Sequence, residues 1–443
     1  MSDIYNRKVL SKFRFLVTVS WIYLTAPLLS GLSHSSPMLE EIIVSAELRQ
    51  PNLFETATSL SVLDTEMIGM REAVHLEQLL NVVPNVNFSS GASRGRFIQI
   101  RGIGERSQFI EPLNPSVGIL IDGIDFTGVA GGATMLDIQQ VEVFRGPQGT
   151  IHGANALAGL VALKSNQPND ETQGNLSLAV GRFETKTFAG ALGGSLHPDI
   201  NFRFALQKHV SDGHIENLFL NRSDTDDINE LSIRSIIDLQ LNESIVTKLT
   251  IFHIDADNGY DGFSLDNSRY TLSDNPGHGR HESTAIALTN IWDGNHSYDL
   301  MALVSFALTD LEYGYDEDWA FPSICDGLEC SGWEYNSQDN YLRDRRNHAI
   351  DIRWVSTRPM ILAGRPSDWV LGVYARDQEE KMLREYTYQV SDFSSIFDTE
   401  NLAFYGQIDL SLTQKFTLMA GVRLENRRAN YSDSDLVTHT KDE

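Results

Sequence analysis

The sequence predicts a mainly β protein in which a small α/β domain is followed by a long antiparallel sheet. Three observations support this: short glycine-bounded apolar strands before residue 168, a period of two beyond it, and joins there that alternate between short and long. The 443 residues carry a net charge of −25, and 41% of them are hydrophobic. Such an acidic chain lacks the basic face that nucleic acids require, so we expect no nucleic-acid partner.

The first 36 residues have the layout of a secretory signal peptide. Four basic residues precede an apolar run from Phe15 to Leu32, and small residues follow it. The run could instead be a retained membrane anchor. However, Pro27 lies where a cleavable segment leaves its helix. We therefore expect a signal peptide over 1–36 and a mature chain that starts near Ser36 or Pro37.

Residues 53–168 have the pattern of a small α/β domain. After Thr65, apolar residues recur at helical spacing as far as Pro84. Short strands are expected at 97–101, 117–121 and 141–144. The preceding stretch, residues 39–46, could pair as an extended strand with another protein or could be a simple tail.

Beyond residue 168, apolar and polar residues alternate, which fits both a soluble sandwich and lipid-facing strands. The connections between the strands favour lipid-facing strands, because short turns on one side and long loops on the other are typical of an outer-membrane barrel. About eleven strands are expected, beginning near 174, 185, 200, 227, 245, 282, 297, 347, 368, 401 and 416. The long joins are expected near 211–226, 256–281, 312–346 and 379–400.

Five short pieces, in this order along the chain, resemble the motifs of TonB-dependent outer-membrane receptors. They are Glu41-Ile42-Ile43-Val44-Ser45-Ala46, Ile100-Arg101-Gly102, Ile121-Asp122-Gly123, residues 141–150 and residues 153–159. The resemblance implies a TonB box and linker over 37–52, a plug domain over 53–168, and the N-terminal half of a transmembrane β-barrel over 169–443. His152 departs from the family's aromatic or aliphatic residue, and we interpret it as a packed polar substitution.

Barrels of this family have about 22 strands, more than the residues after Pro168 can supply. The expected fold class is therefore mainly β, with a small α/β plug domain followed by an incomplete antiparallel transmembrane β-barrel of about 11 strands out of 22. On this basis we expect a fragment or a truncated gene product.

The resemblance implies a receptor in the cell outer membrane for the energy-coupled uptake of a scarce nutrient, most often a ferric siderophore or similar iron complex. TonB would add a strand to Glu41, Ile42, Ile43, Val44, Ser45 and Ala46. The plug apex would bind ligand, because arginines suit an anionic chelate. Its candidate residues are Arg94, Arg96, Arg106, Gln108, Phe109 and Phe126. In the family, residues placed like Arg101 and Arg145 belong to a polar network between plug and barrel. The alternative is a truncated or degenerate receptor without transport, at most a surface-binding protein.

One acidic stretch, residues 310–340, has nine acidic residues and no Lys or Arg. It contains Cys325 and Cys330, which suit a local disulfide, and Trp319, Phe321 and Trp333, which could face a ligand. A solvated loop without a binding role is the alternative.

We expect no enzyme activity, cofactor or metal site. The chain has no nucleophile elbow and no metal-spaced His/Cys cluster. The acidic run from Asp255 to Asp266 has Tyr260 where a calcium loop needs Gly.

Overall fold

The computed structural model describes residues 43–44, 46–49, 56–90, 94, 97–106, 115–294, 297–328 and 335–442. The signal peptide expected over 1–36 lies outside these ranges. No helix within them is long and apolar enough to cross a membrane.

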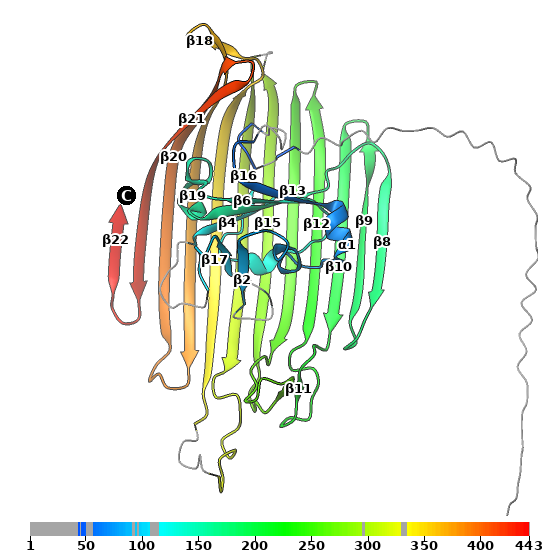
Figure 1. The fold of residues 1–443 in the computed structure, drawn as a ribbon, viewed down its shortest axis with the longest axis vertical. Coiled ribbons are helices and arrows are strands. Elements are labelled where there is room, and N and C mark those ends of the chain that lie inside the picture. Colours follow the sequence, from blue (N-terminus) through cyan, green and yellow to red (C-terminus); the bar gives the residue numbers. More distant parts are fainter. Residues whose placement is uncertain are drawn as a thin grey trace, which may run out of the picture. The chain divides into compact units, whose positions relative to one another are not determined.

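The N-terminal part forms a small mixed sheet, here called the small domain together with its helices and hairpin (Figure 1). Its strand order is β1 (Leu60–Asp64), β6 (Ile138–Arg145), β7 (Gly159–Ser165), β4 (Val117–Ile121) and β5 (Ile124–Asp125). Strands β4 and β7 are parallel, whereas the other neighbours are antiparallel. A separate antiparallel hairpin joins β2 (Val86–Ser89) and β3 (Phe97–Ile100). The strands expected near 97, 117 and 141 are thus confirmed.

The helices of the small domain are all short. They are α1 (Thr65–Met70), α2 (Glu77–Leu80), α3 (Gly149–His152) and the 3₁₀ helices η2 (Ala130–Gly132) and η3 (Gly153–Ala156). Helix α1 begins where Asp64 Oδ1 accepts a hydrogen bond from the Met67 amide at 2.9 Å. The helical pattern from Thr65 to Pro84 is therefore present, but it is split where Glu72 adopts a positive φ of 49°.

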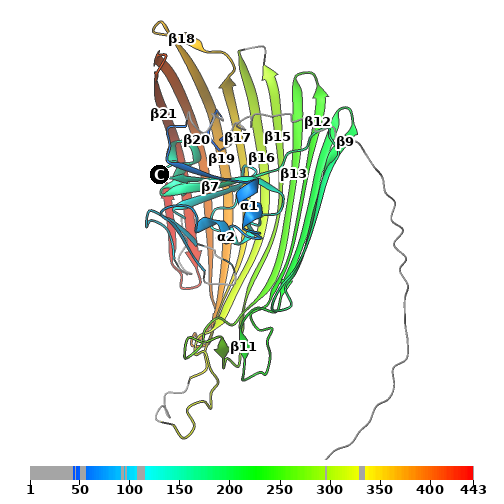
Figure 2. The same cartoon turned by 45° about the vertical axis from the view of Figure 1, so that its right-hand side comes forward.

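The rest of the chain forms one long sheet of 13 strands, almost all joined in sequence order (Figure 1). Its strands are β8 (Gln173–Val180), β9 (Lys186–His197), β10 (Ile200–Ser211), β12 (Ile228–Asn242), β13 (Ile245–Tyr260), β15 (Gly277–Gly294), β16 (Tyr298–Asp316), β17 (Gln338–Ser356), β18 (Met360–Leu362), β19 (Arg365–Tyr386), β20 (Phe393–Thr413), β21 (Phe416–Asp433) and β22 (Thr438–Asp442). Neighbours along it are antiparallel, and the sheet is curved across its width (Figure 2). Two short strands, β11 (Glu216–Asn217) and β14 (Tyr270–Thr271), pair in parallel within the connections.

The expected fold class, an incomplete antiparallel transmembrane β-barrel of about 11 strands out of 22, is wrong. The described residues form 22 strands, 13 of them in the long sheet. All eleven expected strands are present, but β11, β14 and β18 have only two or three residues and β22 has five. Strands that short contain too few side chains for a period of two to appear in the sequence. One expected long join is also wrong: β19 and β20 extend so far that only 387–392 connect them.

The alternation in the long sheet places large apolar side chains on its exposed face. On β20, Leu402 and Phe404 are 47% and 55% exposed, whereas Ala403 and Tyr405 between them are buried. The same exposed face carries Trp292 and Tyr298, with ring centroids 6.2 Å apart, near one end of the strands. A row of exposed apolar residues that ends in aromatics is typical of strands that face lipid, since a soluble sandwich would bury its apolar face.

The other face of the long sheet packs against the small domain. One hydrophobic cluster contains Ile119, Ile121 and Phe126 of the small domain together with Phe252 and Ala285 of the long sheet. The rings of Phe126 and Phe252 meet edge to face at 5.3 Å. The small domain therefore completes its core with side chains of the long sheet.

We predict that Phe252→Ala destabilises the contact between these two parts. Removing a buried phenylalanine leaves a cavity and costs about 3 to 5 kcal/mol. Ile286→Ala is the control, because Ile286 lies on the opposite face and is 43% exposed. The free energy of unfolding from a denaturant titration in detergent should fall clearly more for the first variant; equal losses would contradict the packing described here.

Candidate functional site

Buried ion pairs join the small domain to the long sheet. Arg94 donates to Glu230 of β12 through Nε at 2.6 Å and Nη2 at 2.8 Å, and through Nη1 to Glu77 at 3.1 Å. Arg203 of β10 binds Asp137 of the small domain through two hydrogen bonds of 2.5 Å. Paired in this way, each charge keeps its hydrogen bonds while it is removed from water.

A third contact fastens the β4–β5 turn. Arg376 of β19 donates to Asp125 at 2.7 Å, and Arg345 of β17 donates to the Thr127 carbonyl. Burial alone would raise the pKa of Asp125, but the guanidinium groups of Arg376 and Arg345 outweigh it and lower that pKa below its usual range. Asp125 is therefore held ionised beneath two arginines.

The ion pairs described above do not include Arg101 or Arg145, whose place in a plug–barrel network stays a prediction. Arg145 donates to the Pro84 carbonyl within the small domain at 3.4 Å, and Arg101 is exposed in a turn with φ of 55°. The ion pairs between the two parts instead use mainly acids of the small domain and arginines of the long sheet. Alternation could have suggested Arg203 and Arg376, because each occupies the inward phase of its strand, but their partners depend on the tertiary fold.

An arginine-rich cavity lies between the small domain and strands β17, β19, β20 and β21. It is lined by Arg343, Arg345, Arg376 and Arg427 from the long sheet, with Glu105 and Phe97 from the small domain. These arginines already have partners in the protein: Arg343 pairs with Glu380 at 2.5 Å, and Arg376 with Asp125 at 2.7 Å. Even so, arginines from three strands give the cavity a basic wall.

The predicted ligand residues are distributed unequally around this cavity. Arg106 is exposed and directly follows Glu105, which lines the cavity. Arg94 is 9% exposed and engaged with Glu230, while Phe126 is 1% exposed and packs against Phe252. Arg96, Gln108 and Phe109 lie outside the described residues. The ligand roles of all six remain predictions.

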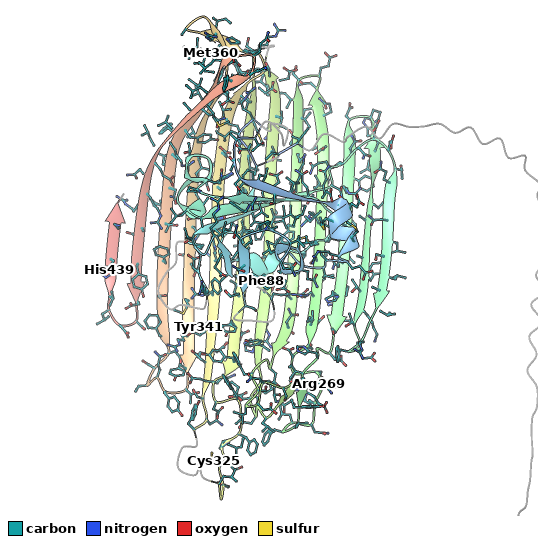
Figure 3. The ribbon with its side chains drawn as sticks, viewed as in Figure 1. Phe88, Arg269, Cys325, Tyr341, Met360 and His439 are labelled. Atoms are coloured by element: carbon teal, nitrogen blue, oxygen red, sulfur yellow. The ribbon has the colours of Figure 1, made fainter. Side chains whose placement is uncertain are left out.

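A group of aromatic side chains lies at one end of the long sheet, near the ends of β13 and β16 and in the connections that follow them. Tyr260, Phe263, Tyr313 and Tyr315 contact one another with centroids 5.6–6.0 Å apart, and Trp319 stacks on Phe263 at 5.0 Å. This end also holds Arg269, Cys325 and Tyr341, whereas Met360 lies at the opposite end (Figure 3). The sequence analysis named Trp319 and Phe321 but not the tyrosines, although Tyr313 and Tyr315 lie within residues 310–340, on strand β16.

Only one of the two cysteines of the predicted disulfide lies within the described residues. Cys325 is disulfide-bonded and 7% exposed. Cys330 lies outside the described residues, so its pairing with Cys325 stays a prediction.

The predicted TonB-binding segment contacts the small domain. Val44 is fully buried against Phe144, Leu160 and Ala162, whereas Ile43 is 43% exposed. Farther along, Arg49 forms ion pairs with Asp368 and Asp409 at 3.2 and 3.3 Å, at the short-turn end of β19 and β20. Glu41, Ile42 and Ser45 lie outside the described residues.

Two polar side chains hold the backbone at Ala46. Its amide donates to Glu142 Oε2 at 2.9 Å, and its carbonyl accepts a hydrogen bond from His152 Nε2 at 3.1 Å. Burial lowers the pKa of His152 to about 4, which keeps the ring neutral at pH 7. His152 is packed as expected, yet it also fixes the segment, a contact that the sequence did not indicate.

Comparison with known proteins agrees with this geometry. Residues 52–160 match the TonB-dependent Receptor Plug Domain family. The pesticin receptor of Yersinia enterocolitica is 23% identical over 374 residues, covering 80% of this chain and 51% of the relative. The vitamin B12 transporter BtuB of Vibrio vulnificus is 24% identical over 183 residues, covering 40% of this chain and 28% of the relative. The chain spans about half the length of the pesticin receptor.

Solved structures share the fold. The ferric yersiniabactin uptake receptor FyuA of Yersinia pestis has a TM-score of 0.72 and 17% identity, covering 87% of this chain and 60% of that one. The siderophore receptor PiuA of Acinetobacter baumannii also has a TM-score of 0.72, with 15% identity, covering 91% of this chain and 63% of that one.

A plug-like domain held by ion pairs against strands with an exposed apolar face is the architecture of the outer-membrane receptors described above. Residues 52–160 match the plug domain of TonB-dependent receptors, and the chain as a whole is similar to these outer-membrane receptors in sequence and in fold.

We predict that acid weakens the contact of residues 43–49 with the small domain through His152. Because the pKa of His152 is depressed to about 4 by burial, its contribution is complete above its ordinary pKa of 6.5 and is lost as the pH falls toward 4. Amide hydrogen exchange of this segment, corrected for intrinsic rates, should therefore accelerate between pH 7 and pH 5.

His152→Gln is the control, because glutamine can donate to Ala46 but does not titrate. Burial raises the pKa of Glu47, so its protonation strengthens the contact as the pH falls, opposite to the effect of His152. This effect is the same in the wild type and in the His152→Gln variant. The charged neighbours Asp351, Arg353 and Arg423 are likewise common to both. Equal pH dependence in the two proteins would contradict the role of His152.

Proposed function

We propose that this chain takes part in the energy-coupled uptake of an anionic iron complex of the ferric siderophore class across the outer membrane. The observation that carries the proposal is the arginine-rich cavity between the small domain and the long sheet. Many ferric chelates are anionic, and planar guanidinium groups bind oxyanions through paired charge-assisted hydrogen bonds. The proposal requires no covalent chemistry.

The position of the cavity along the strands supports this proposal. Arg343 is five residues from the start of β17, at the end where the long connections lie. Long connections of outer-membrane barrels face the exterior. A ligand that arrives from outside would meet the aromatic group first and the arginines next.

The segment that TonB would bind lies toward the opposite end. Arg49 contacts Asp368 and Asp409, which are close to the short turns, and short turns face the periplasm. TonB would pair with residues 41–46 by strand addition. Because Val44 is buried, TonB would have to displace the segment from the small domain before or during pairing.

Proteins similar to this chain transport more than one class of ligand, ferric siderophores among them. FyuA is a ferric yersiniabactin uptake receptor and PiuA is a siderophore receptor, whereas BtuB is a vitamin B12 transporter. Basic side chains on the cavity wall favour an anionic chelate for this chain.

We predict that Ile43→Pro abolishes uptake while leaving ligand binding unchanged. Proline removes the Ile43 amide hydrogen and cannot form the strand ladder that TonB requires. Ile43→Ala is the matched control, since it keeps that amide. A receptor-deletion strain expressing each variant should be tested for growth and radio-iron uptake on a panel of ferric chelates; uptake by the proline variant equal to wild type would refute energy coupling.

We predict that Arg427→Gln weakens binding of an anionic ferric chelate. Losing one charge-assisted hydrogen bond costs about 1.5 to 3 kcal/mol, or about tenfold or more in the dissociation constant. Arg346→Gln is the control, because Arg346 pairs with Asp344 and its side chain is 51% exposed. Fluorescence titration of outer membranes that contain each variant measures its dissociation constant for the chelate. Equal affinities would exclude the cavity as the ligand site, whatever the result of the uptake experiment.

A further inference from the structure

Three aspartates from two segments of the chain converge beside the aromatic group. Asp274 lies in the connection from β13 to β15, Asp316 ends β16, and Asp318 follows it in the next connection. Each offers a carboxylate oxygen, and these oxygens lie within 4.8 Å of one another. We call these three residues the aspartate cluster.

The cluster contains buried oxygen atoms that lack hydrogen-bond partners. These atoms are Asp274 Oδ1, Asp316 Oδ2 and Asp318 Oδ1. Asp316 is only 6% exposed, so water cannot readily replace the missing donors. A buried carboxylate oxygen without a donor or a countercharge is costly, and three carboxylates this close repel one another. A cation bound among these oxygens would relieve the repulsion.

The described part of the chain supplies no such charge. Among its ion pairs, none includes Asp274, Asp316 or Asp318. Arg269, from the same connection as Asp274, pairs instead with Glu216 at 3.0 Å. This cluster thus differs from the acids of the small domain, which meet arginines.

The remaining oxygens of the cluster are used to hold its shape. Asp316 Oδ1 accepts hydrogen bonds from the Asp318 and Trp319 amides, both at 3.2 Å. Asp274 Oδ2 accepts from Asn336 Nδ2 at 3.3 Å, and the Asp274 amide donates to the Ala320 carbonyl at 3.0 Å. In two of the aspartates one oxygen is fixed by the protein while the other, partnerless one is left for a ligand.

We propose that Asp274, Asp316 and Asp318 form a binding site for Ca²⁺. Oxygen ligands from two segments suit a hard cation that tolerates irregular coordination, whereas Mg²⁺ demands a near-ideal octahedron and transition metals favour nitrogen or sulfur. The bound ion cross-links the 261–276 and 317–337 connections next to Trp319. This inference does not depend on the cargo of the receptor.

No local pattern in the sequence indicates this site, and the sequence alone predicts no metal. Calcium-loop patterns place their ligands within about a dozen consecutive residues. Here Asp274 and Asp316 are brought together only because β15 and β16 form a hairpin between them.

Terbium luminescence tests the proposal on the full chain in detergent. Tb³⁺ resembles Ca²⁺ in its ligands, and Trp319 is close enough to the cluster to sensitise its emission. We expect Tb³⁺ emission that Ca²⁺ displaces, with a Ca²⁺ dissociation constant on the order of 10⁻⁴ to 10⁻³ M, as for extracellular modules. Titration calorimetry with CaCl₂ measures the same constant without the probe.

Asp316→Asn and Asp274→Asn should each weaken Ca²⁺ binding by about tenfold or more, since even a supporting group costs a metal site that much. Asp326→Asn is the matched control, because Asp326 is an exposed acid in the same connection as Asp318. Near-UV circular dichroism checks that each variant folds. Absence of calcium binding by the wild type, or unchanged affinity in both cluster variants, would overturn the proposal.

Discussion

The pairing of buried charge between the small domain and the long sheet is the constraint on which the rest of the structure depends. Arg94 meets Glu230 on β12, Asp137 meets Arg203 on β10, and Asp125 meets Arg376 on β19. Any shift of the small domain would leave several charges buried without partners, at a cost of several kcal/mol each. The domain therefore has one favoured position, and displacing it requires external work of the kind that TonB is proposed to deliver.

Periodicity predicted the long strands because alternation is a local property of the chain. It could not decide whether Leu402 and Phe404 face a core or lipid, since both arrangements repeat every two residues. The structure decides this, because Ala403 and Tyr405 are buried while Leu402 and Phe404 are exposed. The same limit explains the ion pairs: alternation marks Arg376 as inward, but only the tertiary fold brings it to Asp125.

The contacts of residues 43–49 could not be predicted for a related reason. The sequence indicated a strand-forming segment that a partner could pair with, which depends only on local residue types. Its actual neighbours, Glu142 and His152, lie about 100 residues farther along the chain. Because Glu142 is fully buried, its carboxylate depends on donors such as the Ala46 amide, and the segment is therefore part of the folded domain.

One short helical stretch links the arginine-rich cavity with this segment. His152 ends α3 and donates to Ala46, whereas Asn155, in the adjoining η3, lines the arginine-rich cavity. Asn155 also lines a second cavity, which contains both Ala46 and His152. His152, which holds residues 43–49 through Ala46, is only three residues from Asn155. A ligand that moves Asn155 would therefore also move His152. Coupling between the cavity and residues 43–49 needs a contiguous element with two arrangements. By thermodynamic linkage the coupling acts in both directions. Release of residues 43–49 would change the affinity for ligand by the same factor by which ligand changes the equilibrium of their release.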